Sequence, residues 1–210
     1  MARYHLFGGA GAGSLVVEFL LRESNTDYDI VFTDKRLRES KEFLQKSPLG
    51  RIPVLVCPDG KVIYESLAIV AHLTDSFPGL APQVGDPLRD KYNQYMALIA
   101  TTMYPAYHRQ YHTYQYGPEA SSDGIRRTAR DLNTRLFDYI ESLLDPYLCG
   151  ETLTAADFYL YMLCRWEHDK AAMRSGRPRL AALLDELRAR DSVSYVLSTQ
   201  AQHAFIEKTA

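Results

Sequence analysis

Apolar positions follow two different patterns along the chain. Between residues 3 and 77, short apolar runs alternate with segments of helical period, which predicts the order β-α-β-α-β-β-α. The expected strands span residues 3–7, 28–32, 54–57 and 62–64, and the expected helices span residues 15–23, 39–46 and 67–77. The sequence CPDGK between the last two strands predicts a hairpin, because Pro, Asp and Gly favour tight turns. These two strands should therefore be antiparallel.

Prolines and glycines cluster in PGLAPQVGDP, residues 78–87, and beyond them apolar positions recur with helical period only. The expected helices there span residues 92–99, 125–144, 155–166 and 180–190. The third of them has Thr154 in the N-cap position and Asp157 in the place of a capping-box acid. We therefore predict an α/β domain over residues 1–78, a linker over residues 79–87 and an all-helical domain over residues 88–210.

A glycine-rich bend, FGGAGAGS at residues 7–14, follows the first expected strand. Glycines after a strand can bring backbone N–H groups close to a phosphate. A dinucleotide fingerprint would need a glycine in place of Ser14, and a P-loop would need a lysine after Gly13. The bend therefore delivers a serine hydroxyl to the start of a helix, where Ser14 could also be a simple N-cap.

Composition and charge exclude several classes of partner. The 210 residues are 46% hydrophobic and carry a formal net charge of −2, which is typical of a globular protein without a basic field for nucleic acid or an anionic membrane. The three cysteines are widely spaced and lack a C-x-x-C pair, so neither a disulfide framework nor a zinc site is predicted. We find no leader pattern and no apolar run of about 18 residues, and we expect a cytoplasmic protein.

Four landmarks in order resemble the glutathione transferase superfamily. They are Ile52-Pro53 at the start of a strand, Glu65-Ser66 at the start of a helix, GETLTAADF at residues 150–158 and LYMLCRW at residues 160–166. The last segment, which ends at Trp166, is similar to a helix of bacterial beta-class members. The resemblance implies a thioredoxin-like domain followed by an all-helical domain, a homodimer, and glutathione as co-substrate without a metal.

The resemblance also implies a glutathione site. A cis Pro53 would leave the backbone of Ile52 to bond the cysteinyl part of glutathione, while Glu65 and Ser66 would bind its γ-glutamyl group. Without the resemblance, RIPVLV could be a core strand and Glu65-Ser66 a helix cap. For the glycine carboxylate we propose the cations Arg51 and Lys35, which could equally be solvated.

The resemblance places the thiol-activating group in the glycine-rich bend. Beta-class enzymes read roughly S-P-G-A-C-S-L there, and Gly13 stands where the cysteine would be. Ser14 is the best-aligned hydroxyl and our candidate catalytic residue, with backbone N–H groups of the bend as the alternative. Because thiol–disulfide exchange needs a protein thiolate, deglutathionylation should be weak or absent.

Tyrosines recur at helical spacing at Tyr104, Tyr107, Tyr111 and Tyr114. Such a stripe could be core or dimer packing, or it could line a pocket for a flat aromatic substrate. By similarity to beta-class enzymes, our candidates for a second-substrate pocket are Tyr104 and Trp166, followed by Tyr107 and Arg109.

Two other features of this segment matter. Pro105 should bend the helix or end a turn, because it has no N–H to donate. His108 and His112 are spaced as a metal-ligand pair would be, but no third ligand is evident, so no metal is expected.

Two functional classes follow. The first is a detoxification enzyme that activates the glutathione thiol for attack on a hydrophobic, aromatic electrophile. Its reaction would be conjugation, the displacement of an ether or halide group, or the reduction of a peroxide. The second is a transferase-like binding or interaction module with little or no turnover, favoured by the glycine-filled bend.

Overall fold

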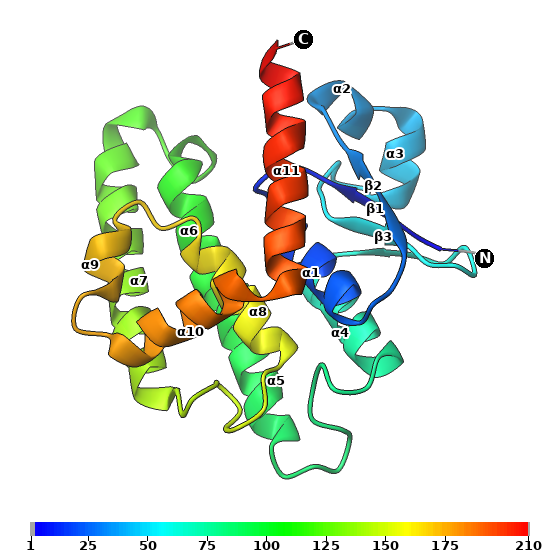
Figure 1. Ribbon diagram of the computed structural model, residues 1–210. Coiled ribbons are helices and arrows are strands. Elements are labelled where there is room, and N and C mark those ends of the chain that lie inside the picture. Colours follow the sequence, from blue (N-terminus) through cyan, green and yellow to red (C-terminus); the bar gives the residue numbers. More distant parts are fainter. Residues whose placement is uncertain (1–2, 210) are drawn as a thin grey trace. The chain divides into compact units, whose positions relative to one another are not determined.

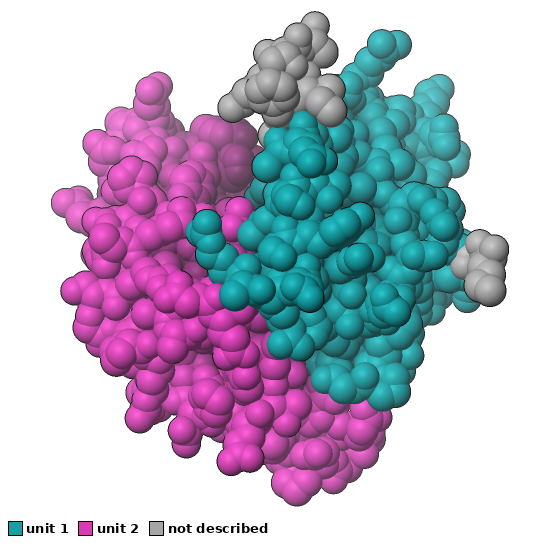
Figure 2. Space-filling model, in the orientation of Figure 1, with its two compact units in different colours: residues 1–80, 188–210 teal, residues 81–187 magenta. Residues whose placement is uncertain are grey.

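The computed structural model describes the backbone of residues 3–209 and the side chains of residues 3–203. The chain forms two compact units (Figure 2), of which unit 1 comprises residues 1–80 and 188–210 and unit 2 comprises residues 81–187. Unit 2 begins inside the linker predicted from the sequence. Residues 188–210, which the sequence prediction assigned to the helical domain, are part of unit 1.

Unit 1 contains a four-stranded mixed sheet (Figure 1). Its strands are β1 (Tyr4–Gly8), β2 (Tyr28–Phe32), β3 (Val54–Val56) and β4 (Val62–Tyr64), in the spatial order β2-β1-β3-β4. β1 pairs with β2 in parallel, and the β1–β3 and β3–β4 pairs are antiparallel. The four predicted strands and the antiparallel hairpin are confirmed, whereas the spatial order of the strands was not predicted.

The described residues of unit 1 form the helices α1 (Leu15–Glu23), α2 (Lys35–Arg38), α3 (Lys41–Lys46), α4 (Ser66–Ser76) and α11 (Asp191–Thr209). The helix predicted over residues 39–46 is shorter, because Ser40 caps α3 by accepting from the N–H of Phe43. Every residue of α1 from Leu15 to Leu21 is buried, and α1 packs against both α4 and α11. The hydrophobic side of α1 is thus covered by α4, which follows the sheet in sequence, and by α11, which is more than 100 residues further on.

A carboxyl group is buried in this packing. Glu18 of α1 is 1% exposed and accepts hydrogen bonds from the Gln200 amide of α11 and from the Tyr28 hydroxyl of β2. Burial raises the pKa of Glu18 to about 8 from its ordinary value of 4.5, and the two hydrogen bonds only partly oppose that shift. The protein therefore folds around a carboxyl group that keeps its proton at neutral pH.

This burial predicts how stability changes with pH. Between pH 4.5 and pH 8 the folded protein retains the proton of Glu18 while the unfolded chain loses it, so the free energy of unfolding falls as pH rises. The Glu18→Gln variant has no carboxyl group at this position and should not show this fall. Its free energy of unfolding relative to the parent should therefore increase by about 2–4 kcal/mol as pH rises from 5 to 8. Urea unfolding at both pH values measures this gain. Parallel pH profiles of the two proteins would contradict it.

The described part of unit 2 is helical. It contains α5 (Arg89–Leu98), a π-helical turn (Ile99–Met103), α6 (Tyr104–Tyr111), the 3-10 turns Thr113–Gln115 and Glu119–Ser121, α7 (Ser122–Leu143), α8 (Ala155–Cys164), α9 (Lys170–Arg174) and α10 (Pro178–Ala189). The last two residues of α10 are assigned to unit 1. The second half of the predicted fold, an all-helical region after the mixed sheet, is confirmed.

The effect of Pro105 is visible where α5 passes into α6. The N–H of Tyr104 donates to the carbonyl of Ile99, five residues earlier, and Pro105 follows at the start of α6. A π-helical turn widens the helix by one residue and so accommodates a position that has no N–H. The expected disturbance at Pro105 is therefore one π-helical turn within a continuous helical run.

The start of α8 is held by a buried carboxylate. Asp157 is fully buried, and its Oδ2 accepts from the N–H (2.8 Å) and the hydroxyl (2.9 Å) of Thr154. Its Oδ1 accepts from the N–H of Leu148 at 2.9 Å. Burial raises the pKa of Asp157 to about 6. The predicted capping box is present, and it also ties the preceding loop to α8.

Candidate functional site

The sheet register brings three predicted segments to one end of the sheet. Phe7 pairs with Val54 across β1–β3, and Val54 pairs with Tyr64 across β3–β4. The residues after β1, before β3 and after β4 therefore lie at the same end. These are the glycine-rich bend, Ile52-Pro53 and Glu65-Ser66.

The peptide bond between Ile52 and Pro53 is cis, as the resemblance implied. The backbone just before it is fixed by the buried Ser47, whose hydroxyl donates to the carbonyl of Arg51 (2.8 Å) and accepts from its N–H (3.0 Å). The sequence analysis missed Ser47, since a serine in a loop carries no pattern that reports such a bond. The result is an ordered approach to the strand that begins at Val54.

Glu65 has an unusual backbone conformation. Its φ of 70° and ψ of 118° lie in the left-handed half of the Ramachandran plot, which costs a residue other than glycine about 1–3 kcal/mol. Glu65 is exposed and is the N-cap of α4, which begins at Ser66. A helix presents N–H groups and the positive end of its dipole at this point. The segment is thus suited to a ligand that carries a carboxylate.

The glycine-rich bend encloses Ser14. This residue is fully buried, and its hydroxyl donates to the carbonyl of Gly9 (3.3 Å) and accepts from the N–H of Gly9 (3.2 Å). Although Ser14 is the N-cap residue of α1, its side chain makes no capping bond. Its predicted role as a thiol donor stays a prediction, and these contacts weigh against it. Within residues 3–203, the N–H groups of Ala10 and Gly13 have no hydrogen-bond acceptor in the protein.

Gly8 permits this close packing. A Cβ atom on Gly8 would lie 2.6 Å from Oγ and 2.8 Å from Cβ of Ser14. We expect Gly8→Ala to lower the free energy of unfolding by about 1–3 kcal/mol, because overpacking displaces the bend. Chemical denaturation measures the loss. The matched control is Gly124→Ala in α7, where an added Cβ meets nothing within 4 Å, and we expect no loss of stability there. Equal stability of Gly8→Ala and the parent would contradict the expectation.

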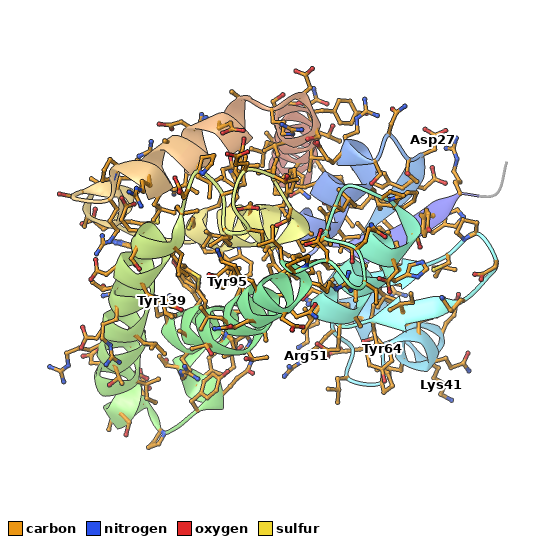
Figure 3. All side chains as sticks on the ribbon, turned by 90° about the horizontal axis from the view of Figure 1, so that it is seen from below. Asp27, Lys41, Arg51, Tyr64, Tyr95 and Tyr139 are labelled. Atoms are coloured by element: carbon orange, nitrogen blue, oxygen red, sulfur yellow. The ribbon has the colours of Figure 1, made fainter. Side chains whose placement is uncertain are left out.

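The two predicted cations lie at this end of unit 1 and are exposed. Phe32, the last residue of β2, pairs with Gly8, so Lys35 follows at the same end of the sheet. The Lys35 side chain is 82% exposed and its Nζ lies 3.7 Å from Glu39. Arg51 directly precedes Ile52, and Figure 3 labels it together with the exposed Tyr64 of β4. Their assignment to a carboxylate stays a prediction.

In unit 2, three of the predicted pocket residues form one aromatic cluster. The ring of Trp166 lies edge-on to Tyr104 at 5.1 Å and to Tyr107 at 6.0 Å between centroids. Tyr107 is fully buried and its hydroxyl donates to Glu167 at 3.0 Å. Tyr104 and Trp166 are half-buried, as is Arg109. Tyr107 therefore supports the cluster from within the core, and Tyr104 and Trp166 present aromatic surface.

The rest of the tyrosine stripe points to solvent. Tyr111 and Tyr114 are 52% and 72% exposed, and the Tyr111 hydroxyl donates to the carbonyl of Trp166. The stripe is therefore part core and part surface.

Cysteine and metal chemistry find little support among the described residues. Cys57, Cys149 and Cys164 are buried free thiols, and burial raises the pKa of Cys149 to about 11. No group of His, Cys, Asp or Glu side chains within residues 3–203 is arranged to hold a metal ion. The described helices include none that is both long and apolar enough to cross a membrane.

Known proteins match both parts of the chain. The model of the glutathione S-transferase N-terminal domain matches residues 2–75, and that of the C-terminal domain matches residues 107–200. The chain is 30% identical over 202 residues to glutathione S-transferase GstA of Escherichia coli O157:H7, covering 93% of this chain and 98% of that protein.

Solved structures agree with these matches. A glutathione transferase of Methylococcus capsulatus has a TM-score of 0.81 and 28% identity, over 95% of this chain and 99% of that one. A sphingomonad glutathione S-transferase complexed with glutathione has a TM-score of 0.80 and 25% identity, over 94% and 98%. The beta-class enzyme of Sphingomonas chungbukensis has a TM-score of 0.79 and 26% identity, over 93% and 98%. The chain therefore belongs to the glutathione S-transferase family, and the protein is a glutathione transferase.

Proposed function

We propose that the protein binds glutathione at the end of the sheet described above and activates its thiol for attack on a hydrophobic, aromatic electrophile. The observation that carries this proposal is the juxtaposition of the cis Ile52-Pro53 peptide with Glu65-Ser66 through the β3–β4 register. Ile52-Pro53, which can bind a peptide backbone, lies there beside Glu65-Ser66, which can bind the zwitterionic end of a peptide. The glycine-rich bend completes the site.

Each part of glutathione has a partner in this arrangement. The backbone N–H and C=O of Ile52 bond the cysteinyl unit, because a cis proline turns that edge outward. The hydroxyl and N–H of Ser66 bind the γ-glutamyl carboxylate at the start of α4, and the Glu65 carboxylate pairs with the ammonium. Arg51 and Lys35 attract the glycine carboxylate from the surface.

Backbone N–H groups of the bend are the better candidates to hold the sulfur. The Ser14 hydroxyl already bonds Gly9, whereas the N–H groups of Ala10 and Gly13 have no acceptor within residues 3–203. They stand just before α1, whose positive end favours an anion. Donors near a helix N-terminus stabilise a thiolate over a thiol and so lower its pKa.

Ser14→Ala tests this assignment. We expect the pKa of bound glutathione, read from thiolate ultraviolet absorbance across pH, to stay within about half a unit of the parent value, because alanine leaves the backbone donors in place. A rise of about one unit or more in a variant with parent-like circular dichroism would make Ser14 the donor instead.

The electrophile is proposed to meet Tyr104 and Trp166. Half-buried aromatic rings next to a buried core suit a flat apolar substrate, and the phenol of Tyr104 offers a polar tip. Conjugation, ether or halide displacement and peroxide reduction all need only an activated glutathione thiolate. Exchange through a protein thiolate is disfavoured, because the bend has no cysteine and the cysteines described are buried.

Two measurements on the purified protein test the function. Retention on immobilised glutathione and turnover of a chlorodinitrobenzene-type electrophile support the proposal. Retention without turnover over a broad panel of electrophiles and peroxides would support the binding module instead.

A homodimer remains part of the proposal. Unit 1 exposes large apolar side chains, namely Val62 and Tyr64 of β4 and Leu49 in the loop before β3, which are 40%, 47% and 72% exposed. Burial of such side chains against a second copy would favour association. Light scattering should give twice the chain mass of 23.9 kDa.

A further inference from the structure

Helix α11 is fastened to α1 at both ends of their contact, within unit 1 (Figure 1). At one end, Arg190 binds the Glu23 carboxylate through Nε at 2.9 and 3.0 Å, and the Ser192 hydroxyl donates to the same carboxylate at 2.6 Å. At the other end, Gln200 reaches the glycine-rich bend and Glu18. The bonds to Glu23 hold α11 against α1. The bonds of Gln200 also fix the glycine-rich bend, which is proposed to bind the glutathione sulfur.

A short hydrogen bond joins the bend to Gln200. The N–H of Gly11 donates to Oε1 of Gln200 at 2.7 Å, although the two residues are 189 positions apart. Gly11 is exposed and has a φ of 66°, which glycine adopts without strain, whereas Gln200 is 6% exposed. The neighbouring bonds, from Ala12 N–H to Gly9 and from Gly9 N–H to Ser14, tie the bend to itself. Gln200 thus ties the tip of the bend to α11.

The hydrogen bonds to Gly11 and Glu18 determine the orientation of the Gln200 side-chain amide. A backbone N–H can only donate, so the carbonyl oxygen of the amide must face Gly11. The NH₂ group then faces away and donates to Oε1 of Glu18. Glu18 also accepts from the Tyr28 hydroxyl, which holds the carboxyl group in place. Tyr28, Glu18 and Gln200 are therefore linked by hydrogen bonds, and the carbonyl oxygen of Gln200 is presented as an acceptor to the N–H of Gly11 in the bend.

We propose that Gln200 is a positioning residue for the sulfur site: its amide fixes the glycine-rich bend through Gly11, and Glu18 fixes the orientation of that amide. The proposal rests on the proposed function, in which N–H groups of Ala10 and Gly13, on either side of Gly11, hold the sulfur. A bend that lacks the bond from Gly11 to Gln200 would aim these donors less well, because hydrogen bonds weaken steeply away from linearity. Neither Gln200 nor Glu18 needs to touch the substrate for this effect.

The test compares variants in the full-length protein by the thiolate absorbance of bound glutathione across pH. Gln200→Met removes the acceptor at similar size, and we expect it to raise the thiolate pKa by about half a unit to one unit. We expect Glu18→Met to shift it in the same direction, since the amide then lacks its orienting partner. Glu18→Gln still offers a carbonyl acceptor to Gln200 and should match the parent.

Ser192→Ala is the matched control, because it loosens α11 at the other end without touching the bend. We expect Ser192→Ala to keep the parent thiolate pKa and kcat. Gln200→Met should lower kcat at neutral pH about threefold to tenfold, and hydrogen exchange of the Gly11 amide should become faster even without glutathione. A Gln200→Met protein with parent-like Gly11 exchange and thiolate pKa would overturn the proposal.

Should Gln200→Met not fold, Gln200→Asn, which shortens the amide by one methylene, gives the same two readouts. Absence of any thiolate band in the glutathione-bound parent would overturn the sulfur site itself, and this proposal with it. That result is distinct from a parent band that no Gln200 variant shifts, which would overturn only the role of Gln200.

Discussion

Replacing Asp157 with alanine is expected to lower the free energy of unfolding by about 3–5 kcal/mol. The carboxylate is fully buried and accepts from Leu148 N–H, Thr154 N–H and the Thr154 hydroxyl. Alanine would leave these donors without a partner in the interior. Differential scanning calorimetry should show a fall of the melting temperature of roughly 10 °C for a chain of this size.

Two variants bracket that result. Asp157→Asn retains one carbonyl acceptor and should lose about half as much stability. Asp131→Ala removes an exposed carboxylate on α7 in the same unit and should change the free energy of unfolding by less than about 0.5 kcal/mol. Equal melting temperatures of Asp157→Ala and Asp131→Ala would show that the hydrogen bonds of Asp157 do not stabilise the start of α8.

The second large effect is expected on glutathione binding. Ser66→Ala should weaken the affinity for glutathione by about tenfold to a hundredfold, because a hydrogen bond to a charged carboxylate is lost. Glu65→Gln should weaken it to a similar extent by removing the charge that pairs with the ammonium. Isothermal titration calorimetry measures both changes. Fold integrity is checked by circular dichroism, since Glu65 occupies a strained backbone position.

Ser76→Ala supplies the control at the opposite end of the same helix. The Ser76 hydroxyl donates to the carbonyl of His72 and is exposed, so its loss should leave the affinity for glutathione unchanged. Parent-like affinity of both Ser66→Ala and Glu65→Gln would show that the γ-glutamyl group binds elsewhere.

Local sequence signals predicted much of unit 1. Alternation of short apolar runs with helical segments predicted the succession of strands and helices along the chain, and the hairpin followed from CPDGK, because each signal is contained in a few neighbouring residues. The cis bond before Pro53 came from the resemblance, since the sequence around a proline does not by itself fix its isomer. The capping box at Thr154 was visible because its two residues are three positions apart.

The parts that were missed depend on distant contacts. Gln200 bonds Gly11 from the far end of the chain, and a lone glutamine carries no pattern that would point to that partner. The role of Ser14 was assigned from its place after the glycines. Its enclosure depends on how closely Gly8 lets the bend pack against Ser14, which is a property of the folded protein and not of the local sequence. The tyrosine stripe likewise divides into core and surface through its neighbours, with Tyr107 held by Glu167.

The return of residues 188–210 to unit 1 has a consequence for biosynthesis. During translation, the sheet and α1 leave the ribosome long before α11 has been made. Until residue 200 emerges, α1 lacks the helix that covers one of its sides, and the tip of the bend lacks its bond to Gln200. Unit 1 can therefore complete its folding only after all of unit 2 has been synthesised. A nascent chain stalled before α11 should be more sensitive to proteases than the finished protein.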